Sequence, residues 1–334
     1  MLNHLRLSRP HSSNGKKPTQ RSKRGGRRGS DTMLPLIIIG MGVAATLIEP
    51  KFASIDNLTN LARQMMPLLI MAVGQAFAII SGGLDLSLAA VMSLAGVVGV
   101  LTMAEYGAAA GIVVMLLTGL VMGGVSGFVI AYFRTSPLVV TLGMLSVAQA
   151  LALILSGGVP IYTIHPGYAQ VVGFDDWLGI PIMVWIGVLF TCLGAFLLRQ
   201  TVFGRYVYAI GSSASAASKS GVNVRLNTML VYMVSGVCAT VCGIVLTAWT
   251  GSAQPVAAPN LTLESLAAVV LGGVALTGGS GGIRQVVYGV VILSMLSNVM
   301  NMVGVSAYYQ TLVIGVVIIL AVILDRLRDR GQEG

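Results

Sequence analysis

The chain has 334 residues, of which 55% are hydrophobic and 9% charged, and its mean hydropathy is +0.87. This composition excludes a soluble globular protein and indicates an integral membrane protein. A formal net charge of +9 can indicate nucleic-acid binding, but the placement of the cations along the chain argues against that function.

The first 32 residues form a basic segment that holds nine of the 20 Lys and Arg residues, from Arg6 to Arg28. The first apolar run begins only at Met33, so the segment lacks the pattern of a cleaved signal peptide. We expect residues 1–32 to form a disordered cytoplasmic tail that fixes the orientation of the protein by the positive-inside rule. A patch for nucleic acid or anionic lipid is the alternative function of these cations.

Apolar runs of spanning length follow this segment and predict an all-α integral membrane domain over residues 33–326, with a cytoplasmic tail at 327–334. We expect about ten transmembrane helices, several of them short or broken. Two weaker runs, 85–104 and 262–277, could be re-entrant. The predicted spans are 33–48, 65–82, 85–104, 110–132, 138–156, 180–198, 226–249, 262–277, 284–303 and 310–325.

The cations support ten spans with both termini in the cytoplasm. Loops assigned to the outside contain only Lys51 and Arg63, two of the 20 basic residues. The remaining 18 fall on the inside, as the positive-inside rule requires. The outer loop at 157–179 contains Asp175 and Asp176 and no Lys or Arg.

Two carboxylates are expected at membrane depth, Asp85 and Glu264. Asp85 follows the glycine pair Gly82 and Gly83, so the preceding helix ends there and Asp85 can accept hydrogen bonds from free N–H groups at the next helix start. Broken helices at this depth are tolerated where they line a water-filled cavity, so Gly82, Gly83, Asp85 and Ser87 are candidates for the translocation pathway. A purely structural cap is the alternative for both Asp85 and Glu264.

Neutral amide side chains also fall inside predicted spans, namely Gln75, Gln149, Asn298 and Asn301. Asn298 and Asn301 lie three residues apart on one helix face, where amides suit a hydroxyl-bearing substrate. We include Gln149, Asn298 and Asn301 among the pathway candidates. Hydrogen bonding between helices is the competing interpretation.

No catalytic or metal-binding pattern is present in the sequence. Cys192, Cys238 and Cys242 lie inside predicted spans, where we expect them to pack as small apolar side chains. The three histidines lie in the tail or a loop, without other ligands at metal-binding spacing. No GxxxxGK[ST], GxSxG, HExxH or CxxC motif occurs. We therefore expect no metal, no cofactor bound by this chain and no enzyme, and the sequence favours a transporter or channel.

The longest polar segment between the apolar runs is residues 199–225, RQTVFGRYVYAIGSSASAASKSGVNVR, which is basic and free of acid. Its centre, 214–219, combines good helix formers with small side chains and predicts a short surface helix that Gly221 ends. A small helix on the inner face of a membrane protein is a suitable contact for a soluble partner.

Three segments resemble the permease subunits of ABC importers for ribose and other simple sugars. They are SGGLDLSLAAVMSLAG at 81–96, AIGSSASAASKSGVNV at 209–224 and LGGVALTGGSGGIRQVVYGVVILSML at 271–296. The closing stretch 298–325 fits as well, and the similarity covers nearly all of residues 50–326.

The resemblance implies a non-catalytic permease of the bacterial inner membrane, with ten spans, that imports a ribose-like pentose, a hexose or a sugar-like signal. It implies a second permease copy or a paralogue, two cytoplasmic ATP-binding subunits that use ATP and Mg, and a periplasmic sugar-binding protein. The loop at 204–225 is then expected to couple this chain to the ATPase. The candidate coupling residues are Gly211, Ala214, Ser215, Ala216, Ala217, Lys219 and Gly221.

The chain departs from the family pattern at two places. Residues 213–217 read Ser-Ala-Ser-Ala-Ala where the family typically has Asn-x-Glu-Ala-Ala, and Ser280 replaces a frequent arginine. Lys219 also reverses the local charge. These departures leave open which ATPase the chain fits and whether two identical copies assemble.

We hypothesise that Ala214, Ala216 and Ala217 pack into a groove of the ATPase, with Lys219 against an acidic rim. An ion-coupled secondary transporter or channel for a small polar solute, with Asp85 and Glu264 as coupling carboxylates, is the alternative class. A membrane scaffold is a third.

Overall fold

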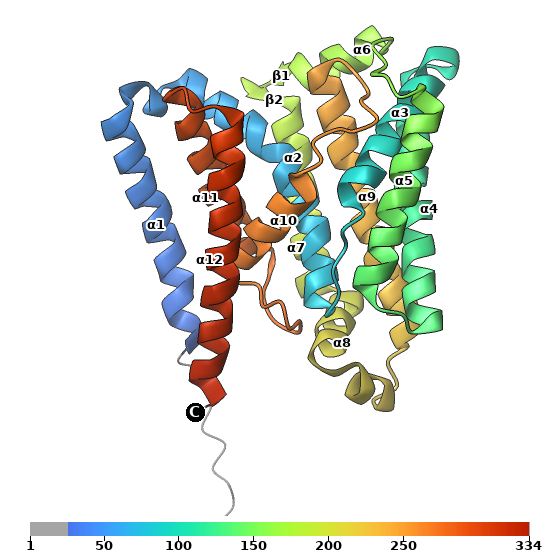
Figure 1. Cartoon of the computed structure of the whole chain (residues 1–334), viewed down its shortest axis with the longest axis vertical. Coiled ribbons are helices and arrows are strands. Elements are labelled where there is room, and N and C mark those ends of the chain that lie inside the picture. Colours follow the sequence, from blue (N-terminus) through green and yellow to red (C-terminus); the bar gives the residue numbers. More distant parts are fainter. Residues whose placement is uncertain (1–25, 334) are drawn as a thin grey trace, which may run out of the picture.

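The computed structural model describes residues 26–333 as a bundle of helices, and residues 1–25 and 334 lie outside the described part (Figure 1). The first half of the chain contains α1 (Gly26–Ile48), a 3-10 turn (Pro50–Ala53), α2 (Ile55–Ile80), α3 (Leu88–Tyr106), α4 (Ala108–Phe133) and α5 (Pro137–Ser156). The second half contains α6 (Pro166–Tyr168), a π-helical turn (Ala169–Phe174), α7 (Ile182–Gln200), α8 (Val202–Lys219), α9 (Val224–Thr250), α10 (Leu261–Leu271), α11 (Ile283–Met302) and α12 (Ala307–Glu333).

The predicted all-α membrane class is confirmed for the described residues. Their only paired strands are β1 (Asp176–Trp177) and β2 (Ile180–Pro181), which form one short hairpin. Seven helices of the described part, α2, α3, α4, α5, α7, α9 and α11, are long and apolar enough to cross a membrane. Shorter apolar stretches are Met33–Ile48, Leu261–Leu271 and Ala307–Val317.

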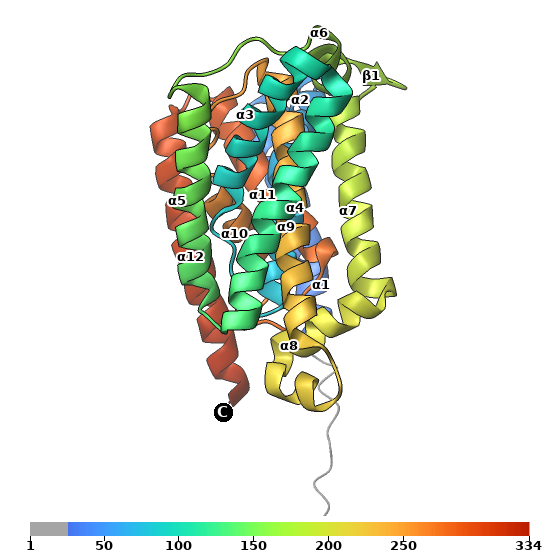
Figure 2. The same cartoon turned by 90° about the vertical axis from the view of Figure 1, so that its right-hand side faces the viewer.

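Helix α2 lies at the centre of the bundle, and every residue from Met66 to Ile80 is buried. It packs against α7, α9, α10 and α11. Figures 1 and 2 show α4, α5 and α7 at the outside of the bundle. Their outer faces are apolar and exposed, as at Phe133 and Ile154, and such faces suit contact with lipid. Cys238 and Cys242 are buried and unbridged, which agrees with a packing role.

A row of glycines holds α4 against α9. Gly119, Gly123 and Gly127 lie four residues apart on α4, and a Cβ atom added at any of them would overlap the α9 backbone between residues 229 and 236. The two helices therefore touch through their backbones, as small residues allow in membrane proteins.

Two predicted spans have different bounds in the structure, next to glycines at which the chain leaves the helix. Helix α3 begins at Leu88, after a non-helical segment in which Gly82 has a φ of +86°. Helix α10 ends at Leu271, although the prediction extended to residue 277, and Gly273 follows with a φ of +93°. Glycine adopts this left-handed region far more readily than other residues, so both breaks are encoded locally.

The terminal helices extend beyond the predicted apolar spans. Helix α1 begins at Gly26, inside the predicted tail 1–32, and α12 continues to Glu333, through the predicted tail 327–334. Backbone hydrogen bonding does not require apolar side chains, so a helix can continue past the end of its apolar run. The remainder of the predicted N-terminal tail, residues 1–25, lies outside the described residues.

The contact between α4 and α9 predicts different effects of the same substitution at neighbouring positions. Gly123→Ala places a methyl group against the carbonyl of Tyr232 and should lower the free energy of unfolding by about 1–3 kcal/mol. Gly124→Ala is the matched control, because its added Cβ would lie 3.7 Å from the nearest atom, Met233 Cγ, and should be neutral or slightly stabilising. Unfolding of the purified protein in detergent measures both, and equal effects would contradict the packing described.

Candidate functional site

Helix α8 contains two helices joined at Ser213, whose backbone is extended (φ −166°, ψ 104°). The hydroxyl of Ser213 accepts a hydrogen bond from the N–H of Ala216 at 3.2 Å, which caps the second helix. This second helix ends at Lys219, and the chain then turns at Gly221 with a φ of +84°. The predicted short helix at 214–219, ended by Gly221, is confirmed, and it is called the knob helix below.

Most of the knob helix is exposed, including Ala214, Ser215, Ala216 and Lys219. Ala217 is the exception, because it is 5% exposed and faces the rest of the chain. The expectation that Ala217 packs into a groove of a partner is therefore wrong for this residue. The helical repeat places Ala216 on a different side of the helix from Ala217, and Ala214 is exposed as well, so Ala217 seats the knob helix while Ala214 and Ala216 are free for contact.

Gly211, just before the knob helix, lies in a junction of three chain segments. The N–H of Gly279, from the loop after α10, donates to the carbonyl of Ile80 at 2.9 Å. A Cβ atom added to Gly211 would overlap both this carbonyl and the N–H of Gly279. Gly278 lies directly against Gly82. We call these residues, Ile80, Gly82, Gly211, Gly278 and Gly279, the glycine junction.

Asp85 follows this junction and is buried, with an exposed fraction of 2%. One carboxylate oxygen accepts from the Ser87 N–H at 3.0 Å and the Ser87 hydroxyl at 2.6 Å. The other accepts from the Ser235 hydroxyl of α9 at 2.8 Å. Asp85 does accept a backbone N–H, as predicted, but α3 begins only after Ser87. The carboxylate also ties the break between α2 and α3 to α9.

The structure does not bring the remaining pathway candidates to Asp85. Asn298 forms two reciprocal hydrogen bonds with Asn57 of α2, at 3.0 and 3.1 Å, and Asn301 accepts from Gln310 of α12 at 2.6 Å. Gln149 donates to the carbonyl of Pro255. These amides connect helices and loops, so the interhelical interpretation describes their contacts in this structure.

Two further polar side chains, Gln75 and Glu264, lie inside the bundle and do not connect helices in this way. Gln75 of α2 is fully buried and its amide has no hydrogen-bond partner within the described residues. Glu264 lies in the first turn of α10 and lines a cavity of about 160 Å³ together with Gln64, Ser294 and Ser297. Glu264 therefore faces a polar cavity between helices rather than only capping its own helix.

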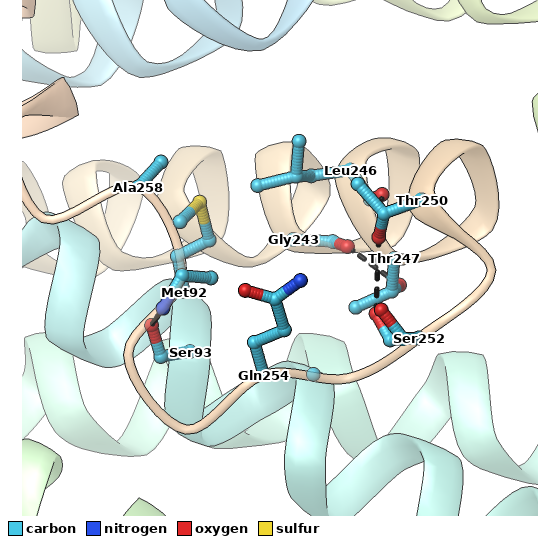
Figure 3. Close-up of a pocket in the computed structure, with 11 residues that line it drawn as sticks. Met92, Ser93, Gly243, Leu246, Thr247, Thr250, Ser252, Gln254 and Ala258 are labelled. Carbon is cyan, nitrogen blue, oxygen red and sulfur yellow. Dashed lines mark hydrogen bonds between the residues drawn. The ribbon is translucent and has the colours of Figure 1, made fainter. Parts of the chain in front are cut away.

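Sequence reasoning missed a cavity of about 170 Å³ between α3, α9 and the loop at 251–260 (Figure 3). In this view the amide of Gln254 extends into the space between Ser93 of α3 and Thr247 of α9. No charged side chain lines the cavity, whose polar residues are Ser93, Thr247, Thr250, Ser252 and Gln254. Because its lining is uncharged and carries hydroxyl and amide groups, the cavity suits a small neutral solute.

The loop at 251–260 is folded inward by four contacts. Ala253 pairs with Ile161, with N···O distances of 2.8 and 2.9 Å, and the N–H of Ala257 donates to Ser93 Oγ at 3.0 Å. Gln149 holds the carbonyl of Pro255. At the base of the cavity, Thr247 bonds with the buried phenol of Tyr168, whose pKa burial raises so that it remains a hydrogen-bond donor. The predicted spans 226–249 and 262–277 left residues 250–261 as a loop, but they did not indicate its inward path.

Comparison with known proteins gives one consistent family. The model of permease components of branched-chain amino acid transport systems matches residues 57–322. Ribose import permease protein RbsC of Escherichia coli (strain K12) is 35% identical over 306 residues, which cover 89% of this chain and 94% of the relative. L-arabinose transport system permease protein AraH of the same strain is 32% identical over 296 residues, covering 87% and 89%.

RbsC of Bacillus subtilis (strain 168) is 35% identical over 289 residues, covering 86% of this chain and 90% of the relative. No solved structure matches the chain. The resemblance found in the three sequence segments is thus confirmed by comparisons over most of the length. The chain belongs to the family of permease components of branched-chain amino acid transport systems, in the part of it that includes the ribose import permeases.

Proposed function

We propose that this chain is the permease subunit of an ATP-driven importer for a simple sugar in the bacterial inner membrane. The observation that carries the proposal is the similarity to ribose and arabinose permeases over more than four fifths of the chain. The uncharged lining of the cavity at Gln254 supports a neutral, hydroxyl-rich solute. An ion-coupled transporter is not favoured, because this family membership offers it no support.

The chain works with a second permease copy or a paralogue, two ATP-binding subunits and a periplasmic sugar-binding protein. ATP and Mg are bound by the ATP-binding subunits and not by this chain. It crosses the membrane about ten times, with both termini in the cytoplasm. Seven long helices and three shorter apolar stretches support this number, and the excess of cations at the end of the bundle with α8 supports the orientation.

Helix α10 cannot cross the membrane alone. Its 11 residues extend roughly 16 Å, about half of the ~30 Å hydrocarbon layer, and the glycine loop at 272–282 completes the distance. Half-helices of this kind occur at substrate pathways in transporters. The pathway therefore runs along the face where α10, the segment 81–87 and the loop at 251–260 lie between α5 and α12 (Figure 1).

Coupling begins at the knob helix. Closure of the ATP-binding subunits displaces its exposed residues, Ala214 and Ala216, while buried Ala217 keeps the helix seated on the chain. The displacement reaches the glycine junction through Gly211, which touches both the end of α2 and the loop after α10. The break between α2 and α3 and the break after α10 both border the pathway, and both are displaced through Gly211.

The function is tested by reconstituting the permease in liposomes with candidate ATP-binding subunits and a sugar-binding protein. Uptake of ribose or arabinose should require both partners and ATP, and the binding protein should stimulate ATP hydrolysis. Sugar accumulation by the permease alone, abolished by a protonophore but unaffected by removal of ATP, would overturn the proposal.

Substitution on the exposed side of the knob helix should uncouple transport. Ala216→Trp places a large side chain where the ATP-binding subunit docks, and we expect binding-protein-stimulated uptake to fall at least tenfold with unchanged thermal stability of the permease. Ala216→Ser is the control for side-chain size. Ala217→Trp should instead lower thermal stability, because Ala217 is buried. Normal uptake by Ala216→Trp would contradict the docking surface.

A side chain at Gly211 in the glycine junction should uncouple ATP hydrolysis from transport. In Gly211→Ala the new methyl group overlaps the carbonyl of Ile80, so the hydrogen bond from Gly279 is displaced. The number of sugars imported for each ATP hydrolysed should fall, and the free energy of unfolding should fall by about 1–3 kcal/mol. Gly143→Ala, whose Cβ would meet nothing within 4 Å, is the matched control and should preserve both. An unchanged transport ratio in Gly211→Ala would show that the junction does not transmit the motion.

A further inference from the structure

A groove of about 760 Å³ lies between the knob helix and the ends of α4 and α9. Figure 2 shows α8 beneath these two helix ends. Three cations from three segments line the groove, Arg134 after α4, Lys219 at the end of the knob helix and Arg225 at the start of α9. Hydroxyl and amide groups of Ser215, Asn223 and Thr228 lie among them.

Nothing acidic balances these cations within the described residues. The groove has no Asp or Glu in its lining. Between Glu105 and Asp175 the sequence contains no carboxylate, and neither does the segment 199–225. Three positive charges that share a concave surface raise the local concentration of anions.

Arg225 connects the groove to an aromatic cluster on α4, which we call the aromatic edge. Phe128 stacks on Tyr132 with ring centroids 4.7 Å apart, and Phe133 contacts Phe128 edge-on at 6.1 Å. All three rings are exposed, and the guanidinium of Arg225 lies 5.7 Å from the centre of the Tyr132 ring. Aromatic and cationic side chains that meet at a helix end are typical of the boundary between hydrocarbon and lipid headgroups.

Arg134 lines the groove and has an unusual backbone conformation. Its φ of +55° places it in the left-handed region, where a residue with a Cβ atom is uncommon, and it ends α4 there. Helices that end this way generally have glycine at this position. The backbone conformation therefore does not by itself account for an arginine here.

We propose that this groove binds the headgroup phosphate of an anionic phospholipid, with its acyl chains along the exposed apolar face of α4. Basic pockets between helix ends on the cytoplasmic side of membrane proteins suit this ligand. The aromatic edge favours a lipid over a soluble phosphate, because the acyl chains have an apolar surface to cover. Ala214, Ser215 and Ser218 of the knob helix also line the groove, so bound lipid stabilises the position of this helix. This site rests on the proposed cytoplasmic position of the knob helix, and it shares Ala214, Ser215 and Lys219 with the candidate coupling residues, so its test includes competition with the ATP-binding subunits.

The test measures lipid binding to the full-length permease after removal of native lipid, by native mass spectrometry in detergent. The probes are phosphatidylglycerol, phosphatidylcholine with the same acyl chains, and glycerol 3-phosphate. We expect phosphatidylglycerol to bind most tightly, and the double variant Arg134→Gln with Arg225→Gln to bind it about thirty-fold more weakly. The matched control, Arg199→Gln with Arg205→Gln, removes the same charge from the same end of the bundle but outside this groove, and should retain binding.

Equal loss of binding in the two double variants would overturn the proposal, because the effect would then come from net charge alone. Binding of glycerol 3-phosphate as tight as that of phosphatidylglycerol would also overturn it and assign the groove to a soluble phosphate. So would displacement of the lipid by the ATP-binding subunits, since the cations would then belong to that protein interface. Thermal unfolding in phosphatidylcholine checks that each variant is folded. If a double variant is not folded, its two single variants are measured in its place.

Discussion

The carbonyl of Ile80 ends α2 inside the bundle, where water does not satisfy it and no further turn of helix follows. An unpaired backbone carbonyl in such a place is costly, so the chain supplies a donor from the loop after α10, nearly two hundred residues later in the sequence. Gly279 provides the N–H, and Gly211 of a third segment can approach only because it has no side chain. The two broken helices and the knob helix are therefore joined by one small group of backbone contacts.

Among the described residues, the buried polar side chains are neutral apart from Asp85, and Glu264 is half-buried in a cavity of its own. Asp85 is satisfied by two serines, Ser87 and Ser235, whose hydroxyl groups and one backbone N–H supply all its contacts. The cavity at Gln254 contains hydroxyl and amide groups only. Neutral groups of this kind can exchange hydrogen bonds with a sugar or with water at similar cost, so a solute can both enter and leave. The strong charges lie instead at the helix ends, where they meet headgroups and partners.

Much of this architecture could be predicted from the sequence because its signals are local. Hydropathy identified the membrane class and most spans, the pair Gly82 and Gly83 located the break before α3, and the composition of residues 214–219 predicted the knob helix. Several of the failures were non-local. Asn298 pairs with Asn57, a residue 241 positions away, and no spacing rule could indicate that contact. The burial of Ala217 and the inward path of the loop at 251–260 likewise depend on neighbours that only the folded chain supplies. The end of α10 was missed because Val274 to Leu276 continue the apolar pattern beyond the last helical turn.

The glycine row between α4 and α9 has a consequence for how the molecule can change shape. The backbones of α4 and α9 are in direct contact at Gly119, Gly123 and Gly127, with no layer of side chains between them that could rearrange. Sliding or tilting of one helix against the other would therefore break these backbone contacts. We expect α4 and α9 to move as one rigid body. Because Ser235 of α9 is hydrogen-bonded to Asp85, the start of α3 moves with them. A change between outward and inward access of the pathway then requires a shear motion between this rigid body and the part of the bundle that contains α10 and α11, along a plane beside α2.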